Sequence, residues 1–166
     1  DTKARTAVAS PGWFGDELNK ELAKDQLIAT TAHDPKVGIG GFFMCGGHST
    51  IGRMYGPACA NLLAADVVTA DGELIHVDDK QNTDYFWAIR GGGPGFFGAA
   101  VRYYIQLHPM PTHRRRSGWS FDIDQFEPIA MWLGKHQNAL PKYVEVAFTG
   151  RTADGKPSLG LGCTIN

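Results

Sequence analysis

Two glycine-rich clusters are the feature of the sequence that points most directly to chemistry. The chain has 21 glycines in 166 residues, well above the usual share of about 7%, and most of the excess lies in residues 38–56 and 91–98. Glycine lets a backbone approach a bound group closely and turn several N–H groups toward it. The clusters therefore indicate loops that hold an anionic, planar cofactor, and tight turns with close packing are the structural alternative.

The second cluster contains a GxGxxG pattern in Gly93-Pro-Gly95-Phe-Phe-Gly98. In a Rossmann dinucleotide site this pattern follows a strand and opens a helix. Here a helix-like segment precedes it and the β-rich residues 99–107 follow. A nicotinamide-dependent Rossmann enzyme would require a helix directly after Gly98. The phosphate loop GxxxxGK[ST], the hydrolase elbow GxSxG and the zinc motif HExxH are absent from the sequence.

Cysteine spacing and charge balance argue against metal-binding, disulfide-rich, nucleic-acid-binding and membrane proteins. Cys45, Cys59 and Cys163 have no CxxC spacing and no histidine at ligand distance, so we expect neither a metal site nor a disulfide framework. With 16 basic and 17 acidic residues, the chain has no field that would attract nucleic acid or a membrane surface. No stretch approaches the roughly 18 apolar residues of a membrane span. We expect neither nucleic acid nor a membrane as a partner.

Hydrophobic periodicity predicts the helices that flank the glycine clusters. Residues 13–25 carry apolar residues at i, i+4 and i+8 between charged ones, which is typical of an amphipathic helix. Residues 84–90 predict a short helix that the following glycines end. Residues 37–47 alternate glycine-rich and apolar runs with no helical period. We therefore expect shaped loops around a short buried segment there.

Alternating apolar residues predict the strands. Residues 65–77 form two β-rich runs around Asp71-Gly72, the pair that a type I′ hairpin turn needs. Residues 99–107 predict a strand that closes at Pro109, where a proline removes a ladder donor. The aromatic residues Phe86, Trp87, Phe96 and Phe97 are assigned to the core, and Cys45 is expected to be buried without redox work.

Residues 109–116 carry two prolines and a basic run, which predicts a boundary between domains 1–109 and 110–166. Beyond it we expect a strand at about 117–122, a helix at about 125–139 and a hairpin that turns at Asp154-Gly155. Two or three strands and one helix could hardly fold alone. The second domain is therefore expected to be truncated, and because Asp1 is not an initiator Met, the N-terminus of the protein is expected to lie further upstream.

Four ordered motifs now make the sequence recognisable: PKVGIGG at 35–41, GG…RMYG at 46–56, NLLAADVVTADG at 61–72, and FWAIRGGG…FG to LHP at 86–109. In order and spacing they resemble the second half of the FAD-binding domain of the vanillyl-alcohol oxidase / p-cresol methylhydroxylase (PCMH) type, especially the berberine-bridge-enzyme-like oxidases. The resemblance implies an α+β fold: a second PCMH-type FAD subdomain in residues 1–109 and the start of an antiparallel-sheet substrate domain in 110–166. It implies that the N-terminal FAD subdomain is missing here.

The resemblance also implies which residues contact FAD, mainly through backbone hydrogen bonds and close approach. They are Lys36, Val37, Gly38, Ile39, Gly40, Gly41, Gly46, Gly47, His48, Ser49, Thr50 and Val68. At Gly40 and Gly47 we expect a Cβ to intrude on the flavin. Asp34 stands where doubly attached members have the flavin-linking cysteine, so a thioether is excluded, and His48 is not assigned as a covalent anchor.

The activity implied by the resemblance is that of an FAD-dependent oxidoreductase, and an oxidase rather than a dehydrogenase. It would transfer a hydride from an alcohol, amine or sugar carbon of a small-molecule substrate to flavin N5, with O2 as the reoxidant that yields H2O2. No catalytic residue is assigned, because the substrate base in such enzymes comes from the substrate domain, and we expect this fragment alone to be inactive. The alternative is a non-catalytic remnant or binding module that has lost flavin, and flavin absorbance separates the two.

Overall fold

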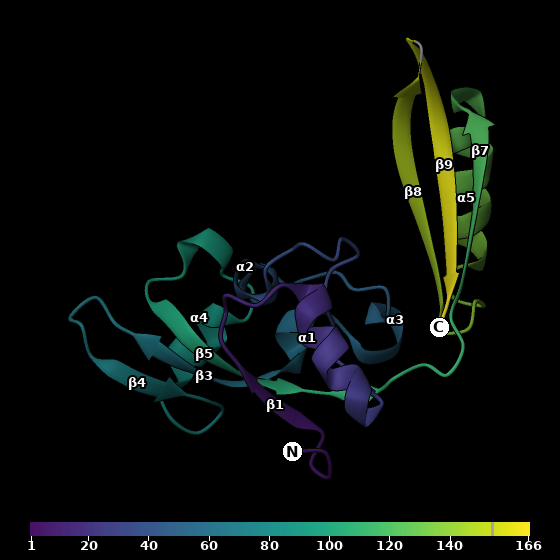
Figure 1. The fold of residues 1–166 in the computed structure, drawn as a ribbon. Helices are drawn as coiled ribbons and strands as arrows, with labels where there is room; N and C mark the ends of the chain where they lie inside the picture. Colours follow the sequence, from purple (N-terminus) through teal and green to yellow (C-terminus); the bar gives the residue numbers. More distant parts are fainter. Residues whose placement is uncertain (154) are drawn as a thin grey trace. The chain divides into compact units, whose positions relative to one another are not determined.

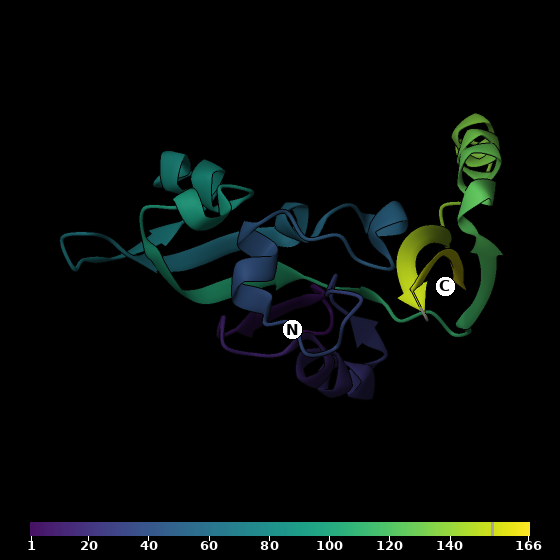
Figure 2. The same ribbon diagram turned by 90° about the horizontal axis from the view of Figure 1, so that it is seen from above.

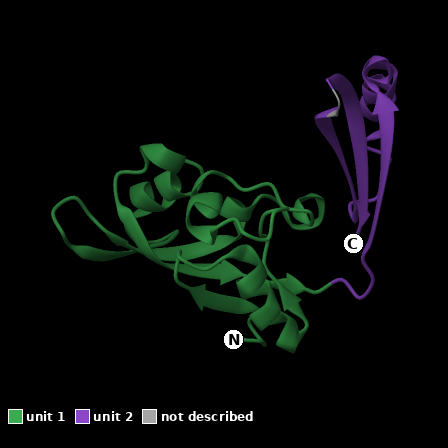
Figure 3. Ribbon diagram, turned by 45° about the horizontal axis from the view of Figure 1, so that its top comes forward, with its two compact units in different colours: residues 1–110 green, residues 111–166 purple. Residues whose placement is uncertain are grey.

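A computed structural model describes residues 1–153 and 155–166, so Asp154 of the expected second hairpin turn lies outside the described residues. The chain divides into two compact units, Asp1–Met110 and Pro111–Asn166 (Figure 3). Each unit combines helices with antiparallel strands, which confirms the α+β class. Within the described ranges, no helix is both long and apolar enough to cross a bilayer.

Unit 1 is built on a four-stranded antiparallel sheet with the order β1-β5-β3-β4. The strands are β1 (Thr6–Ala9), β3 (Leu62–Val68), β4 (Leu74–Val77) and β5 (Ala99–Gln106), and a two-stranded ladder joins β2 (Leu27–Ile28) to β6 (His108–Pro109). The helices are α1 (Gly15–Leu22), α2 (Ile39–Met44), α3 (Gly52–Tyr55) and α4 (Thr83–Ile89). Figure 1 and Figure 2 show β3 and β5 running through the unit, with α1 and α4 toward opposite ends of these strands.

The core of unit 1 lies between one face of this sheet and the helices. Because side chains alternate along a strand, Ala65 on β3 and Tyr103 on β5 face inward together and are fully buried. They belong to the same apolar cluster as Phe43 of α2 and Phe86 of α4. The helices predicted at 13–25 and 84–90 and the strand predicted at 99–107 are confirmed as α1, α4 and β5.

The other face of the sheet carries a polar network centred on Asp66 of β3. Its carboxylate accepts hydrogen bonds from Arg102 Nη1 at 2.9 Å and Tyr104 Oη at 3.3 Å, and lies 2.6 Å from His76 Nδ1. These partners stand on β5 and β4, the two neighbours of β3. The network therefore links three neighbouring strands of the sheet.

The hairpin predicted at residues 65–77 is present, but its turn is not type I′. Val68 pairs with Leu74, and the Gly72 N–H bonds to the Thr69 carbonyl at 3.0 Å. Gly72 has a φ of +82°, whereas Asp71 is not among the described non-glycine residues with positive φ. Type I′ needs positive φ at both central residues. The loop is instead a turn over Thr69–Gly72 that ends in a left-handed glycine.

Helix α2 is the clearest departure from the sequence predictions, which placed loops at residues 37–47. Ile39 and Phe43 lie one turn apart and are both buried, at 1% and 0% exposed. Glycine disfavours helices by about 1 kcal/mol per residue relative to alanine, so the sequence carries little helical signal here. Contacts with the sheet and with the segment before α1 stabilise this helix instead.

Unit 2 is a three-stranded antiparallel sheet with one helix. Its strands β7 (Arg115–Asp122), β8 (Val144–Ala153) and β9 (Lys156–Ile165) have the order β7-β9-β8, and α5 (Phe126–His136) confirms the predicted helix. The Phe126 ring of α5 meets the Phe148 ring of β8 at 5.7 Å between centroids. Leu159, which faces the same way as Phe148, is 2% exposed. Helix α5 therefore covers one face of the sheet.

Candidate functional site

The predicted cofactor segment begins with a turn that Asp34 stabilises. Asp34 Oδ1 accepts the Lys36 N–H at 2.8 Å, and the Asp34 carbonyl accepts the Val37 N–H at 3.3 Å. The Val37 carbonyl in turn accepts the Gly15 N–H at 3.0 Å at the start of α1. Lys36 is exposed and Val37 half-buried. The carboxylate at position 34 thus shapes the approach to Gly38, the residue that precedes α2.

Gly40 is enclosed by the rest of unit 1. Its N–H donates to the Pro11 carbonyl at 3.0 Å, and its carbonyl accepts the Tyr103 hydroxyl at 2.9 Å. A Cβ at Gly40 would lie 2.9 Å from the Pro11 oxygen. Burial raises the pKa of Tyr103 well above its usual range, with the Cys45 charge a smaller cause. The Tyr103 hydroxyl therefore stays protonated and available as a donor.

Gly47 is required for a similar reason. It has a φ of +74°, and a Cβ there would lie 2.6 Å from the Ala58 Cβ and 2.9 Å from the Phe42 carbonyl oxygen. The expectation that side chains at Gly40 and Gly47 would intrude on the flavin is therefore wrong as an explanation of these two glycines. Contacts within the chain already exclude a side chain at both positions.

The backbone of Gly46 and Gly47 has one bonded side and one open side. The carbonyls of Gly46 and Gly47 accept the N–H groups of Cys59 and Ala58, both at 2.9 Å. A trans peptide points its C=O and N–H in opposite directions, so the Gly47 N–H points away from Cys59. Among the described residues, the N–H groups of Gly46 and Gly47 meet no acceptor. They are donors suited to polar atoms of a bound group.

Two glycines of the segment border open space. A Cβ built on Gly41 or on Gly46 has no heavy atom within 4 Å among the described residues. Ile39, by contrast, points into the core. We refer to Gly41, Gly46 and Gly47, which combine this open space with unbonded backbone donors, as the glycine cradle.

His48 and His33 lie side by side next to the cradle. Their rings stack with centroids 5.8 Å apart and planes inclined by 15°. A β-bridge between Ala32 and Ser49 places the two histidines opposite each other. Ser49 is buried, with 2% of its surface exposed, and its Oγ accepts the Ile51 N–H at 3.4 Å. Thr50 is half-buried. Ser49 therefore has a structural role that the sequence does not reveal.

Among the predicted site residues, Val68 lies away from the group around α2. It stands at the end of β3, where it pairs with Leu74 and Ala99. Tyr103, which bonds Gly40, pairs with Ala65, three positions earlier on the strand. That separation is about 10 Å along a strand. The structure gathers residues 36–50 around α2 and does not bring Val68 to the same place.

A second layer of contacts supports the cradle through residues 55–61. The rings of His108 and Tyr55 stack at 3.8 Å, and His108 Nε2 lies 2.6 Å from Asn61 Oδ1. Asn61 Nδ2 donates to the Tyr55 and Pro57 carbonyls at 3.1 and 2.9 Å. Asn61 Oδ1 is therefore the acceptor and His108 Nε2 the donor. Burial lowers the pKa of His108, and the charge of Arg5 lowers it further.

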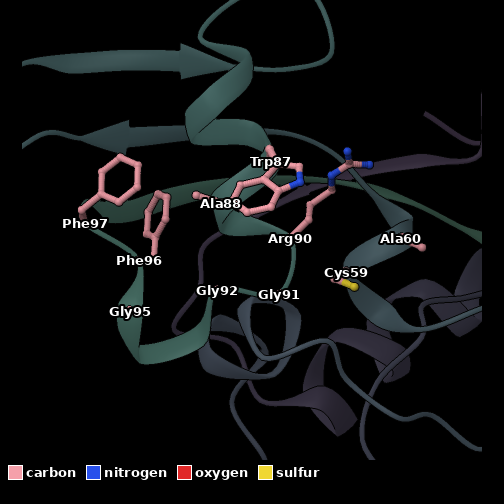
Figure 4. A pocket seen from close by; sticks show the side chains of 10 residues that line it. All are labelled: Cys59, Ala60, Trp87, Ala88, Arg90, Gly91, Gly92, Gly95, Phe96 and Phe97. Atoms are coloured by element: carbon pink, nitrogen blue, oxygen red, sulfur yellow. The ribbon is translucent and has the colours of Figure 1, made fainter.

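The second glycine cluster lines a separate hollow of about 640 Å³ (Figure 4). Trp87 and Phe97 are 79% and 54% exposed, so assigning them to the core is wrong, whereas Phe86 at 4% is buried as expected. The Arg90 guanidinium lies 4.2 Å from the centre of the Phe86 ring. Of the residues predicted to contact FAD, none lines this hollow in the described part of the chain.

Cys45 belongs to the first glycine cluster and lies close to Gly93 of the second. It is exposed, so its predicted burial is wrong, and its Sγ would lie 3.2 Å from a Cβ on Gly93. Sequence reasoning also missed Pro11, Tyr103 and His33 as neighbours of the candidate site. Pro11 and Tyr103 lie far from Gly40 in the sequence and meet it only in the fold, so local patterns contain no signal for these contacts.

Comparisons with known proteins agree with this geometry. The family model described as an FAD binding domain matches residues 1–78. The FAD-linked oxidoreductase nodO of Hypoxylon pulicicidum is 33% identical over 150 residues, which cover 90% of this chain and 34% of that protein. The chain resembles the FAD-linked oxidoreductases and matches their FAD-binding domain. The (R)-6-hydroxynicotine oxidase of Paenarthrobacter nicotinovorans is another relative, 39% identical over 111 residues, or 67% of this chain and 24% of the oxidase.

Solved structures of flavoproteins extend the likeness to nearly the whole chain. This chain matches the berberine bridge enzyme of Eschscholzia californica with a TM-score of 0.84 and 27% identity, over 99% of this chain and 34% of that one. It matches 6-hydroxy-D-nicotine oxidase of Arthrobacter nicotinovorans with a TM-score of 0.84 and 28% identity, over 99% and 37% of the two chains. The PCMH-type fold is thereby confirmed. The chain spans about a third of the length of these relatives.

FAD is the cofactor of this family, and the cradle fits it. Gly46 and Gly47 offer backbone donors with no acceptor among the described residues, and Gly41 and Gly46 leave space where a side chain would stand. A planar, oxygen-rich group needs both features, since its oxygens accept hydrogen bonds and its ring needs close backbone approach.

Proposed function

We propose that the complete protein is an FAD-dependent oxidase of a small molecule. An alcohol, amine or sugar carbon would lose two electrons and a proton as a hydride, and its heteroatom would lose a proton. O2 would take up the two electrons and two protons and leave as H2O2. Bound FAD supplies the hydride acceptor, while the protein positions the substrate and cofactor.

The residues that would hold FAD are those of the first cluster. The N–H groups of Gly46 and Gly47 would donate to cofactor oxygens, and Gly41 would admit its ring or ribityl arm. The neighbouring segments from Lys36 to Ile39 and from His48 to Thr50 would complete the contact surface. Val68 stays in the proposal as a backbone contact from the end of β3. The open N–H groups of Gly46 and Gly47 are the observation that carries this assignment.

The two units would have different tasks in the complete enzyme. Unit 1 would be the C-terminal part of the FAD-binding domain, and unit 2 would begin the substrate domain. An N-terminal FAD subdomain would supply further cofactor contacts. We therefore expect the isolated 166-residue chain to be inactive.

The names of the relatives support oxidation of a small organic molecule. They differ in the electron acceptor, since both oxidases and dehydrogenases occur among them. One relative is an (R)-6-hydroxynicotine oxidase. Among the structural neighbours, wild-type Phl p 4.0202 is a glucose dehydrogenase, and a single-residue Phl p 4 variant is a glucose oxidase. A single side chain therefore changes whether O2 accepts the electrons in these proteins. We propose O2 as the acceptor here because oxidases occur among the relatives.

Two assays of the purified complete protein test the proposal. The flavin content should be close to one FAD per chain, and a panel of alcohols, amines and sugars should contain a substrate whose oxidation yields peroxide in a peroxidase-coupled assay. Bound FAD with reduction by a substrate but no peroxide would replace the oxidase by a dehydrogenase. Protein that is folded but takes up no FAD would favour the non-catalytic remnant.

A further inference from the structure

The second glycine cluster, which the proposed cofactor site does not use, forms one wall of the hollow of about 640 Å³ in unit 1. The rest of the lining comes from the end of α4 and from residues 59–60 (Figure 4). Small-molecule pockets span about 300–1,000 Å³, so this hollow has room for a ligand larger than a single ring. None of the residues assigned to FAD lines it in the described part of the chain.

Exposed aromatic rings line the hollow. Phe86 of α4 is buried, whereas Trp87 beside it and Phe97 of the following loop are exposed. The Phe97 ring packs against the Tyr85 ring, with centroids 4.8 Å apart, and lies 5.5 Å from the Phe96 ring. Exposed apolar groups that gather in this way mark a binding surface. The face of an exposed indole is a platform on which a planar base can stack.

Arg90 gives the hollow its positive charge. Its guanidinium lies 4.2 Å from the centre of the Phe86 ring, which holds it at the end of α4. In the described part of the chain Arg90 forms no ion pair, and no acidic residue lines the hollow. The acidic residue of α4, Asp84, stands six positions earlier, about 9 Å away along the helix axis. An arginine without a carboxylate partner is suited to a phosphate, whose oxygens accept its N–H donors.

The loop after Arg90 leaves part of its backbone accessible. Gly91 has a φ of +127°, and a Cβ built on Gly91 or on Gly95 meets no heavy atom within 4 Å among the described residues. The Gly91 N–H has no acceptor in that part of the chain, whereas the Gly92 N–H bonds to the Ala88 carbonyl at 2.9 Å. The loop therefore offers a free backbone donor and two open positions next to Arg90.

We propose that this hollow binds a purine nucleotide as a second ligand, separate from FAD at the glycine cradle. The base stacks on the Trp87 indole, and the phosphate pairs with the Arg90 guanidinium and the Gly91 N–H. Cys59 lines the hollow, and its N–H bonds to the Gly46 carbonyl at 2.9 Å. The nucleotide therefore lies against the segment that supports the cradle.

Calorimetric titration of the complete protein with AMP and with adenosine tests the charge. The two probes share the purine, and only AMP carries a phosphate. AMP should bind about tenfold or more tightly than adenosine, the usual effect of a charge-assisted hydrogen bond, and Arg90→Gln should remove this preference. Arg115→Gln is the matched control, because Arg115 is an exposed arginine of unit 2. Equal affinity for the two probes, or a preference that survives Arg90→Gln, overturns the proposal.

A second variant tests the stacking. Trp87→Ala removes an exposed side chain, so the protein should fold as before while the affinity for both probes falls about tenfold. Unchanged affinity in this variant contradicts a base on Trp87.

The adenine nucleotide half of FAD carries the same groups as AMP, so the titration is run both before and after saturation with FAD. AMP should bind with the same affinity in both cases. Binding that FAD abolishes assigns the hollow to the cofactor and overturns a separate nucleotide site. AMP binding through Arg90 in a protein that oxidises no substrate overturns only the oxidase function.

Discussion

The Tyr103 hydroxyl donates a hydrogen bond to the Gly40 carbonyl at 2.9 Å, although 63 positions separate the two residues. Tyr103 is fully buried in the middle of β5, and Gly40 lies in the first turn of α2. The bond ties the helix that carries Gly41 to the central sheet. Because Gly40 also bonds Pro11, the start of α2 is held from two sides.

Replacing Tyr103 by phenylalanine should remove this tie and leave a buried carbonyl without its donor. Such a loss costs about 1–3 kcal/mol of unfolding free energy. Urea unfolding of the complete protein measures it. Tyr104→Phe is the control, because Tyr104 sits on the opposite face, where its bond to Asp66 is 3.3 Å long, and we expect a smaller loss. Equal stability of Tyr103→Phe and wild type would show that this hydrogen bond does not stabilise the fold.

Gly41 and Gly40 should respond to substitution in opposite ways. Gly41→Val places its side chain in open space, so the protein should remain folded and lose most of its bound FAD. Gly40→Ala places a methyl group 2.9 Å from the Pro11 oxygen, so it should lower stability by roughly 1–3 kcal/mol. Flavin absorbance per chain and thermal unfolding separate the two effects. Full FAD occupancy in Gly41→Val would exclude the cradle as the cofactor site.

The difference between these neighbouring glycines shows where sequence reasoning ends. The motifs at 35–41 and 46–56 predict a glycine-rich cofactor segment, and its backbone borders open space at Gly41 and Gly46. They do not say which glycine faces a ligand and which faces Pro11, because that depends on contacts between residues far apart in the chain. The amphipathic helix α1 and strand β5 were predictable, since their burial pattern repeats locally. Helix α2 was not, since Tyr103 and Pro11 stabilise it from a distance.

His108 should make stability depend on pH. Burial lowers its pKa in the folded state from the usual histidine value of 6.5, so below pH 6.5 the unfolded chain takes up a proton that the folded chain does not. The contribution to stability is therefore complete above about pH 6.5 and is lost as the pH falls through the interval below it. His108→Gln should show a smaller decrease in unfolding free energy over that interval. Identical pH slopes in wild type and variant would contradict this role.

Asp34 leads to a prediction about flavin attachment. A carboxylate cannot form the thioether expected of a cysteine at this position, and the Asp34 side chain instead accepts the Lys36 N–H. Peptide mapping of the acid-denatured complete protein should find no flavin on Asp34, Cys45 or Cys59. Any covalent bond should be a single one, to a histidine of the N-terminal FAD subdomain that the proposal adds to this chain. Flavin on Cys45 or Cys59 would refute the alignment of the whole glycine-rich region.

The most direct test of the central claim is the visible absorption spectrum of the complete protein, purified and then incubated with FAD. The account predicts the visible absorption band of bound flavin, with one FAD per chain that gel filtration does not remove. The Gly41→Val variant should lack this band while keeping the wild-type far-UV circular dichroism spectrum. A wild-type protein that is folded and colourless after incubation with FAD would contradict the claim.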